Sequence, residues 1–398
     1  MEILQENPQN AIEYYNLYLR NTNNHENPNE ISARINLGFL YERILAYQDA
    51  AKEYAHVLDK LMDEINPNSP KPYLIAIPFQ YARIYKYDLG NGSYKAAVTR
   101  ASKVYQDMLQ RWPNSKAALL ALNYVSLIML QNKDYSRLQQ ILDEQLQITQ
   151  DTTILARLQF LQAKIMLAQH VDPATVIRQL QRIITNYPDS EIIAAVKLEL
   201  AKAYLQQQRF EKTRLILKDI LNNYLENFIV AAEAQEQLAL SFELEGRWDQ
   251  ALNEYRWLSK QFETSLQGLT APLKIANYYL QQNNIALADQ AFNEAIEFYQ
   301  ELVRKYPSSI LAAMAQEQIS KCFMAQRKYE EAIGAVKKIK EIWSNSAGVI
   351  STYLLLGKIY EASNQYSLAA RAYKEIATQF PQHPLAPLFD EKARQLLN

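Results

Sequence analysis

The chain has 398 residues, of which 48% are hydrophobic, and its 42 basic and 43 acidic residues leave a net charge of −1. A near-neutral chain lacks the basic excess with which general nucleic-acid binders displace counterions. The single cysteine, Cys322, excludes an intrachain disulfide and a cysteine-cluster metal site. No run of about 18 apolar residues exists, so no transmembrane segment is predicted, and Met1 is not followed by a signal-sequence pattern. Only 8 glycines in so long a chain favour helices over β-sheets.

The first predicted helix contains Ala11 and Tyr15, which are four residues apart and therefore share one helix face. Later in the chain, this kind of pair belongs to the second helix of a repeat. The matching first helix would lie before Met1. We therefore expect that an N-terminal segment has been removed, either a signal or lipid-anchor peptide or further repeats. The alternative is a frayed half-repeat at the native start of the chain.

Two rows of residues recur along the rest of the chain, and the steps along the first row range from 37 to 44 residues. The first row consists of small residues, each followed three residues later by a large one: Gly38, Ala82, Ser126, Ala163, Ala201, Ala239, Ala276, Ser320 and Gly357. The second row pairs each member with a large residue four positions later: Ala50/Tyr54, Ala101/Tyr105, Leu138/Leu142, Val176/Leu180, Thr213/Leu217, Ala251/Tyr255, Ala295/Tyr299, Ala332/Val336 and Ala369/Tyr373. Two rows in register predict that two helices of each repeat pack closely at the small residues.

Similar joints separate the repeats, namely "RWPNSKAALLA", "NYPDSEIIAA" and "KYPSSILAAMAQ". Proline cannot continue a helix, and the serine that follows can cap the next one. Each repeat is therefore predicted to be a helical hairpin. The repeat with Ala276 and Ala295 has its small residues 19 apart instead of the usual 12, which predicts a longer second helix.

The stretches "LGFLYERILAYQDAAKEYAHVL", "LALSFELEGRWDQALNEYRWL" and "LGKIYEASNQYSLAARAYKEIATQFP" resemble tetratricopeptide repeats, and the resemblance covers almost the whole chain. It implies an all-α fold, a right-handed superhelical solenoid of antiparallel helical hairpins. The period of about 37 residues exceeds the family's 34. This period and the joints are similar to those of a bacterial envelope subgroup, which includes outer-membrane assembly lipoproteins and the periplasmic coordinator of the Tol–Pal system. The C-terminal "FPQHPLAPLFDEKARQLLN" resembles the closing helix of such proteins.

We predict three parts in the chain. Residues 1–66 form the N-terminal partial repeat and the first hairpin, and "MDEINPNSPKPY" (Met62–Tyr73) is the loop that follows, a candidate hinge. Residues 67–382 form a continuous array of about eight hairpins. Residues 383–398 form a C-terminal capping helix.

A search for chemistry finds no catalytic constellation. The histidines fall in different repeats or loops without an i, i+4 partner. They are His25, His56, His170 and His383. Cys322 has no nearby histidine and is expected to be a packed thiol, and the scattered glycines form no phosphate loop. We predict no enzyme activity, no metal site and no cofactor.

In a solenoid, the residue after each first-row small residue is expected to point to the concave side. Five of these nine positions are basic, and we predict that they bind a partner: Arg83, Lys164, Lys202, Lys321 and Lys358. Such a groove suits an acidic peptide or helix. The alternative is a set of ordinary exposed side chains neutralised by nearby glutamates. These glutamates are Glu233, Glu236, Glu243 and Glu317. No position pair matches the lysine and asparagine clamp of chaperone-binding family members.

The resemblance implies a non-catalytic scaffold that holds protein or peptide partners on its concave face, in a bacterial periplasmic or membrane-associated assembly. A trimmed N-terminus would favour the periplasm or envelope, with peripheral or lipid-anchored membrane association, and otherwise the chain would be cytoplasmic. One alternative is a cytoplasmic adaptor or regulatory array of a larger protein. Another is the substrate-recruiting arm of an enzyme whose catalytic domain is absent.

Overall fold

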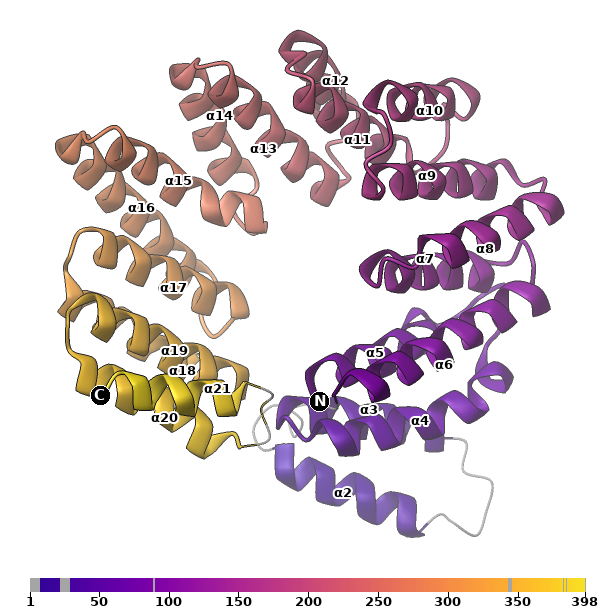
Figure 1. The fold of residues 1–398 in the computed structure, drawn as a ribbon, viewed down its shortest axis with the longest axis horizontal. Coiled ribbons are helices and arrows are strands. Elements are labelled where there is room, and N and C mark those ends of the chain that lie inside the picture. The colour runs from indigo at the N-terminus through magenta and orange to yellow at the C-terminus, as the bar shows by residue number, and fades with distance from the viewer. Residues whose placement is uncertain are drawn as a thin grey trace. The chain divides into compact units, whose positions relative to one another are not determined.

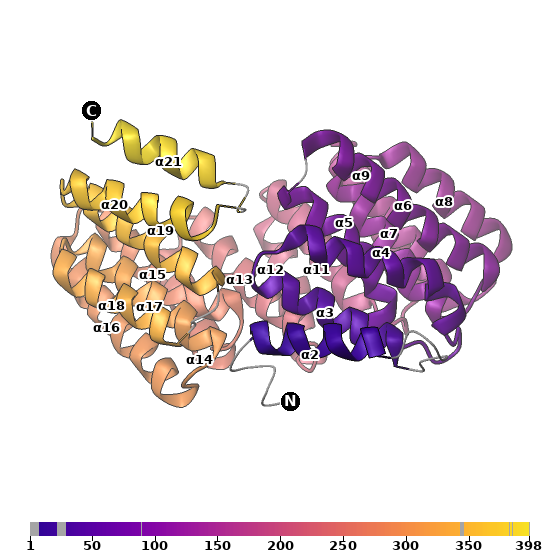
Figure 2. The ribbon, with the colours of Figure 1, turned by 90° about the horizontal axis from the view of Figure 1, so that it is seen from below.

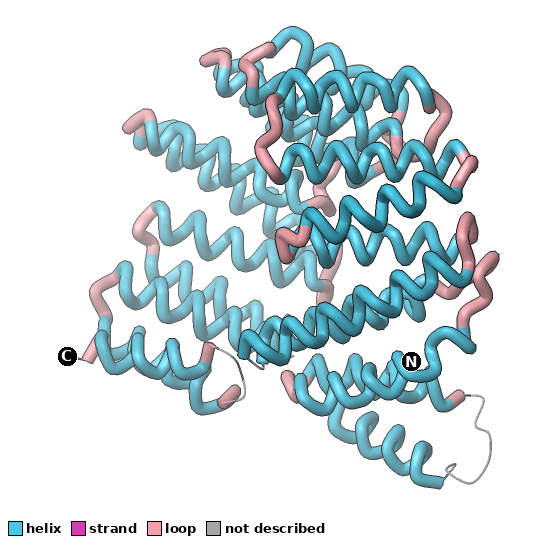
Figure 3. Tube along the Cα trace, turned by 45° about the vertical axis from the view of Figure 1, so that its right-hand side comes forward, coloured by secondary structure: helices cyan, strands magenta, loops and turns pink. Residues whose placement is uncertain are grey.

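The computed structural model describes residues 8–21, 29–88, 90–342, 346–381, 383 and 385–397. Every regular element in these residues is an α-helix, and the connections between helices are short (Figures 1 and 3). Within the described chain, one leading helix is followed by nine pairs of helices and a closing helix. The all-α array of helical hairpins expected from the sequence is confirmed.

The helices form two compact units, which are described separately. Unit 1 comprises Met1–Gln169 and Ala377–Pro387, and unit 2 comprises His170–Ile376 and Leu388–Asn398. The helices of unit 1 are α2 (Pro8–Asn21), α3 (Glu30–Arg43), α4 (Tyr47–Glu64), α5 (Pro72–Asp88), α6 (Gly90–Arg111), α7 (Lys116–Gln131), α8 (Tyr135–Ile148) and α9 (Thr152–Ala168). Those wholly or mainly in unit 2 are α10 (Pro173–Asn186), α11 (Ile193–Gln206), α12 (Phe210–Asn223), α13 (Phe228–Leu244), α14 (Trp248–Gln261), α15 (Leu266–Gln281), α16 (Ile285–Lys305), α17 (Ile310–Ala325), α18 (Tyr329–Ile342), α19 (Ser346–Ala362), α20 (Tyr366–Gln379) and α21 (Ala386–Gln395).

In unit 2, the first helices of consecutive hairpins pack on one another. Helix α11 contacts α13, and the same holds for α13 with α15, α15 with α17 and α17 with α19. Among the described residues, the second helices of unit 2 do not pack on each other to a comparable extent. The first helices are therefore closer together, and their side of unit 2 is the concave one.

The first-row and second-row residues are buried throughout the hairpins. The second-row tyrosines Tyr54, Tyr105 and Tyr299 are fully buried. In two hairpins the tyrosine ring lies directly on the first-row residue. A Cβ added at Gly38 would collide with the ring of Tyr54, and one at Gly357 would collide with the ring of Tyr373. The small residues are thus needed because the aromatic ring of the second helix packs on the backbone of the first.

The hydroxyl groups of these tyrosines are bonded in one of two ways. In three hairpins with the 12-residue spacing, the hydroxyl donates to a glutamate four residues after the first-row residue. These bonds join Tyr54 to Glu42 (2.7 Å), Tyr255 to Glu243 (2.6 Å) and Tyr373 to Glu361. Burial and the neighbouring carboxylates raise the pKa of each of these tyrosines above its ordinary value.

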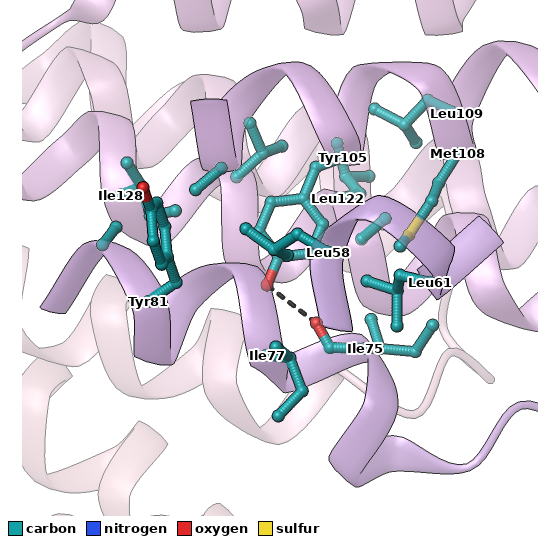
Figure 4. Packing of buried hydrophobic residues seen from close by; sticks show 14 of the residues in the cluster. Leu58, Leu61, Ile75, Ile77, Tyr81, Tyr105, Met108, Leu109, Leu122 and Ile128 are labelled. Carbon is teal, nitrogen blue, oxygen red and sulfur yellow. Dashed lines mark hydrogen bonds between the residues drawn. The ribbon is translucent and has the colours of Figure 1, made fainter. Parts of the chain in front are cut away.

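The two hairpins with the 19-residue spacing contain a proline inside the first helix. Pro78 in α5 lies four residues before Ala82. Tyr105 of α6 donates to the carbonyl oxygen of Ile75 (2.7 Å; Figure 4) and accepts the N–H of Phe79 (3.1 Å). Its hydroxyl therefore takes the place of the helical hydrogen bond that the proline opens.

The same arrangement occurs in unit 2. Pro272 lies in α15, four residues before Ala276, and Tyr299 of α16 donates to the carbonyl oxygen of Leu269 (2.8 Å). The Leu273 N–H donates to the same hydroxyl. A proline and a tyrosine at equal register in both units show that the longer second helix goes together with a first helix that contains a proline.

The turn inside eight of the described hairpins places one residue in the left-handed region, with φ between 55° and 79°. Each of these residues comes seven positions after its first-row residue: Leu45, Lys133, His170, Gln208, Gly246, Asn283, Arg327 and Asn364. Only Gly246 is a glycine, although a side chain costs roughly 1 kcal/mol in this conformation. The packing of the two helices therefore imposes the turn, and the chain needs few glycines to make it.

The joints behave as predicted in two cases and differently in a third. Ser115 caps α7 and Ser309 caps α17, each accepting a backbone N–H at 3.1 Å. In "NYPDS", however, Ser190 does not cap a helix. Helix α11 begins only at Ile193, and the hydroxyl oxygen of Ser190 is buried without a hydrogen-bond partner in the described chain.

The remaining predicted segments are also located. The loop expected between Met62 and Tyr73 connects α4 to α5 within unit 1, and a domain boundary after residue 66 stays a prediction. The closing helix α21 lies beside α20 (Figure 2), where Phe389 stacks on Tyr373 with ring centroids 6.1 Å apart. Residues 1–7, which bear on the expected trimming, lie outside the described residues.

Replacing Ala239 by arginine should destabilise unit 2 by about 3 kcal/mol or more, because the site is fully buried and the new side chain is both too large and charged. Leu240→Arg is the matched control, since Leu240 is only half-buried. Urea unfolding of both variants measures the difference. Equal stability of the two variants would contradict the packing role of Ala239.

Tyr105→Phe should cost about 1–3 kcal/mol of unfolding free energy, because the Ile75 carbonyl and the Phe79 N–H are left without a partner in the interior. Tyr373→Phe should cost at most about 1 kcal/mol, because the Glu361 side chain is 30% exposed and keeps its bond to Lys392. Urea unfolding compares the two variants. A loss for Tyr105→Phe no greater than that for Tyr373→Phe would show that the hydroxyl does not repair the proline helix.

Candidate functional site

The concave side of unit 2 carries a hollow of about 300 Å³ between α13, α14 and α15, named here the inner hollow. Two of its residues, Leu240 and Asn277, are first-row-plus-one positions, which the sequence pattern places on this side. The other lining residues are Glu243, Trp248, Tyr255, Lys274, Tyr278 and Gln281. The stacking of first helices therefore brings together side chains from two successive hairpins.

One wall of the inner hollow is aromatic. The rings of Trp248 and Tyr278 are stacked, with centroids 3.4 Å apart and an angle of 15° between their planes. The indole nitrogen of Trp248 is buried and has no acceptor in the described part of the chain. This wall offers a flat aromatic surface to a partner, while the indole N–H itself lies beneath it.

The charged groups at the inner hollow are already paired. Glu243 accepts the hydroxyl of Tyr255 at 2.6 Å, and Lys274 lies 2.5 Å from Glu236. The side-chain amides of Asn277 and Gln281 have no hydrogen-bond partner among the described residues. The groups left for recognition are therefore two amides and an aromatic wall. These suit the main chain and the apolar side chains of a peptide better than a charged ligand.

Two of the five predicted basic residues lie in unit 1. Arg83 of α5 donates to Gln80 at 2.8 Å and is ion-paired with Glu42 of the preceding hairpin. The ammonium of Lys164 in α9 lies 4.8 Å from the ring centroid of Phe160 and has no ion pair in the described chain. Of these two residues, only Lys164 is without an ion pair in the described chain.

The other three predicted basic residues lie in unit 2. Lys202 is paired with Glu199 (3.2 Å) and Glu233 (2.5 Å). Burial lowers the pKa of Lys202, but these two carboxylates outweigh it and the pKa ends above its usual value. Lys321 is paired with Glu317 at 2.8 Å, whereas Lys358 is exposed and forms no ion pair in the described chain.

The structure thus places the five basic residues in two separate units and pairs three of them with glutamates. Their role in partner binding stays a prediction. The inner hollow was not predicted from the sequence, because only the basic side chains among the first-row-plus-one positions were expected to bind a partner. Leu240 and Asn277 belong to the same row, and Trp248 begins the next helix. Their combination of apolar and amide side chains was the available signal.

The side chains that most often take part in catalysis or metal binding are either buried or dispersed in the described chain. Cys322 is fully buried as expected, and burial raises the pKa of its thiol to about 12. No group of three or more histidine, cysteine, aspartate or glutamate side chains in the described residues is arranged to hold a metal ion. His25 lies outside those residues.

The comparison with known families matches two segments of unit 2. Residues 273–309 and 351–383 fit the sequence model of the tetratricopeptide repeat. The first segment includes α16 and the joint before α17, and the second includes most of α19 and all of α20. These two segments resemble tetratricopeptide repeats. Their match supports the repeat alignment derived above, whereas no finding supports the bacterial envelope subgroup.

Solved structures match the chain at low sequence identity. Yeast Tom70 aligns with 98% of this chain and 86% of its own, at 11% identity and a TM-score of 0.51. A tetratricopeptide repeat protein from Parabacteroides merdae covers 80% of this chain and 98% of its own, at 12% identity and a TM-score of 0.36. No curated protein sequence matches the chain. The likeness to Tom70 shows the fold alone.

A search for membrane-spanning helices gives a negative result for the described residues. None of these helices combines sufficient length with sufficient apolarity to cross a bilayer. The hairpins bury apolar side chains against neighbouring helices.

The thiol of Cys322 should react with iodoacetamide at pH 8 at least about a hundredfold more slowly in the folded protein than in urea, because burial and the raised pKa remove the thiolate. Mass spectrometry of the alkylated peptide over time measures both rates. Rapid alkylation of the folded chain would show that Cys322 is accessible, and a nucleophilic role would then return to consideration.

Proposed function

We propose that the chain is a non-catalytic scaffold that holds protein partners, with a partner segment seated in the inner hollow of unit 2. The observation that carries this proposal is the meeting of Leu240, Trp248 and Asn277 on the concave side of tetratricopeptide hairpins. A scaffold needs an exposed surface with apolar area and unsatisfied hydrogen-bonding groups, and the inner hollow has both.

The seated segment is best matched by an uncharged stretch of peptide. The amides of Asn277 and Gln281 can each donate to a carbonyl and accept from an N–H of its main chain. An apolar or aromatic side chain of the partner can pack on the Trp248 and Tyr278 rings. The acidic partner suggested by the basic residues is supported by Lys164 and Lys358, while Arg83, Lys202 and Lys321 would have to exchange their glutamates for it.

A bacterial envelope setting is supported by the joints "RWPNS" and "NYPDS" and the repeat period, which resemble those of envelope proteins. In that setting the scaffold belongs to a periplasmic or membrane-associated assembly. The full reading frame tests this setting. A signal peptide or lipobox upstream would favour it, further repeats would favour a cytoplasmic adaptor, and a fused catalytic domain would favour a recruiting arm.

A photo-crosslinking amino acid placed at Asn277 should capture a partner protein in cells of the source organism, whereas the same group at Glu297 should not. Glu297 is the control because it is exposed on the second helix α16. Capture is identified by mass spectrometry. Leu240→Asp combined with the Asn277 crosslinker should reduce the captured fraction about tenfold by placing a charge in the hollow.

Equal capture from Asn277 and Glu297, or capture that Leu240→Asp leaves unchanged, would remove the inner hollow from the proposal. A melting curve of the Leu240→Asp variant serves as the folding control. Because Leu240 is only half-buried, this variant should stay folded.

A further inference from the structure

The joint that connects α10 to α11 differs from the serine-capped joints before α7 and α17, and it forms part of a second surface. Its serine, Ser190, was expected to cap the next helix, yet α11 begins three residues later, at Ile193. The residues between them form a loop beside the joint that precedes α13. Together these two loops and the start of α13 enclose a hollow of about 840 Å³, named here the joint hollow. It is lined by Pro188, Asp189, Ser190, Glu191, Ala194, Tyr224, Glu226, Asn227, Phe228 and Ile229.

Large apolar side chains are exposed at the joint hollow. Ile229 is 76% exposed and Phe228 is 41% exposed, although Asn227 fixes both at the start of α13 by capping it. Leu225, in the preceding loop, is 49% exposed. Single exposed apolar residues are common, but three within five residues at the rim of a hollow form a patch that a partner would cover.

The charges around the joint hollow have one sign. Its lining contains the carboxylates of Asp189, Glu191 and Glu226 and no lysine or arginine. Lys197 contacts Tyr224 of the lining: it lies 3.2 Å from the hydroxyl of Tyr224 and 2.5 Å from Asp219. Since Asp219 already neutralises Lys197, and neither Asp189 nor Glu226 has an ion pair in the described chain, these two carboxylates leave an excess of negative charge.

A neighbouring hollow extends this surface. It has a volume of about 670 Å³, and Lys197 and Asp219 line it together with Ile184, Leu200, Leu215 and Ile216. Leu215 is 73% exposed. Since Lys197 also contacts Tyr224 of the joint hollow, the two hollows lie on either side of one hydrogen-bonded contact.

We propose that the joint hollow docks a segment of a partner protein in which lysine or arginine stands next to large apolar residues. The apolar side chains of this segment cover Phe228 and Ile229, and its basic groups bind the carboxylates of Asp189 and Glu226. This proposal rests on the proposed function in that the chain holds protein partners, but it assigns a different surface and a partner of opposite charge to the acidic one.

The test uses the full chain and two fluorescein-labelled peptides, followed by fluorescence anisotropy at about 0.15 M salt, where weak surface attraction is screened. One peptide carries two leucines between pairs of lysines, and the other replaces the lysines with glutamates. The lysine peptide should bind, and the glutamate peptide should bind at least about tenfold more weakly.

Two variants locate the binding. Asp189→Lys with Glu226→Lys should weaken the lysine peptide at least about tenfold, and Ile229→Ser should weaken it several-fold, about fivefold. Matched controls are Asp107→Lys with Glu297→Lys, which changes the net charge equally at exposed helix positions, and Ile310→Ser, at an isoleucine that is 61% exposed at the start of α17. Neither control should change binding more than about twofold.

The inference is overturned if the lysine peptide does not bind, if both peptides bind equally, or if the control variants weaken binding as much as the joint-hollow variants. Crosslinking from Asn277 separates this failure from that of the proposed function. Partner capture at Asn277 in a chain that does not bind the lysine peptide would leave the scaffold intact and remove only the joint hollow.

Discussion

The close approach of two helices at one small residue is the constraint on which the rest of the structure depends. Where the second-helix tyrosine lies on Gly38 or Gly357, no room remains for even a methyl group. This contact fixes how far along each helix its partner crosses, and therefore where the turn falls. The turn residue then adopts a left-handed conformation whether or not it is glycine, as at Arg327 and Gln208. Tertiary packing thus overrides the local backbone preference at the same point of each described turn.

The tyrosine hydroxyl shows how the same contact serves two kinds of hairpin. In three of the short hairpins, a glutamate of the first helix accepts a hydrogen bond from it. In the long hairpins, Pro78 or Pro272 has opened the first helix, and the hydroxyl bonds to the freed backbone groups. A buried hydroxyl without a partner would be costly in either case. In the long hairpins a backbone carbonyl replaces the carboxylate as the acceptor. The tyrosine ring can therefore occupy the same position whether or not the first helix contains a proline.

The sequence was sufficient to predict the hairpins because their determinants are local and repeat. The small residue represented by Gly38 and the large residue represented by Tyr54 recur at equivalent positions of the repeats. The spacing alone predicts which residues share a helix face. The electrostatics of the site could not be predicted in this way. Lys202 forms an ion pair with Glu233 of the next hairpin, and Arg83 forms one with Glu42 of the previous hairpin. These ion pairs therefore depend on how helices pack across repeats.

Two further features could not be predicted from the sequence for a similar reason. The prolines of α5 and α15 lie in register with a tyrosine of the following helix, which is visible in the sequence only once the long hairpins are aligned with each other. The serine of "NYPDS" has the same sequence context as the serines that cap α7 and α17. Whether it caps depends on where α11 begins, and Ile193 is buried there against the core. The local sequence therefore predicts a capping serine, but the packing of the helix determines whether the serine is at its N-terminus.

The distribution of charge gives the two candidate surfaces different tasks. On the concave side, lysines and glutamates of neighbouring first helices neutralise each other, as at Lys274 and Glu236, and recognition falls to amides and aromatic rings. At the joint hollow, the carboxylates of Asp189 and Glu226 have no ion pair in the described chain and lie beside exposed apolar side chains. The chain as a whole has a net charge of −1, but the joint hollow has a local excess of negative charge. Because screened charges act only over about 10 Å, it is this local excess that a partner meets.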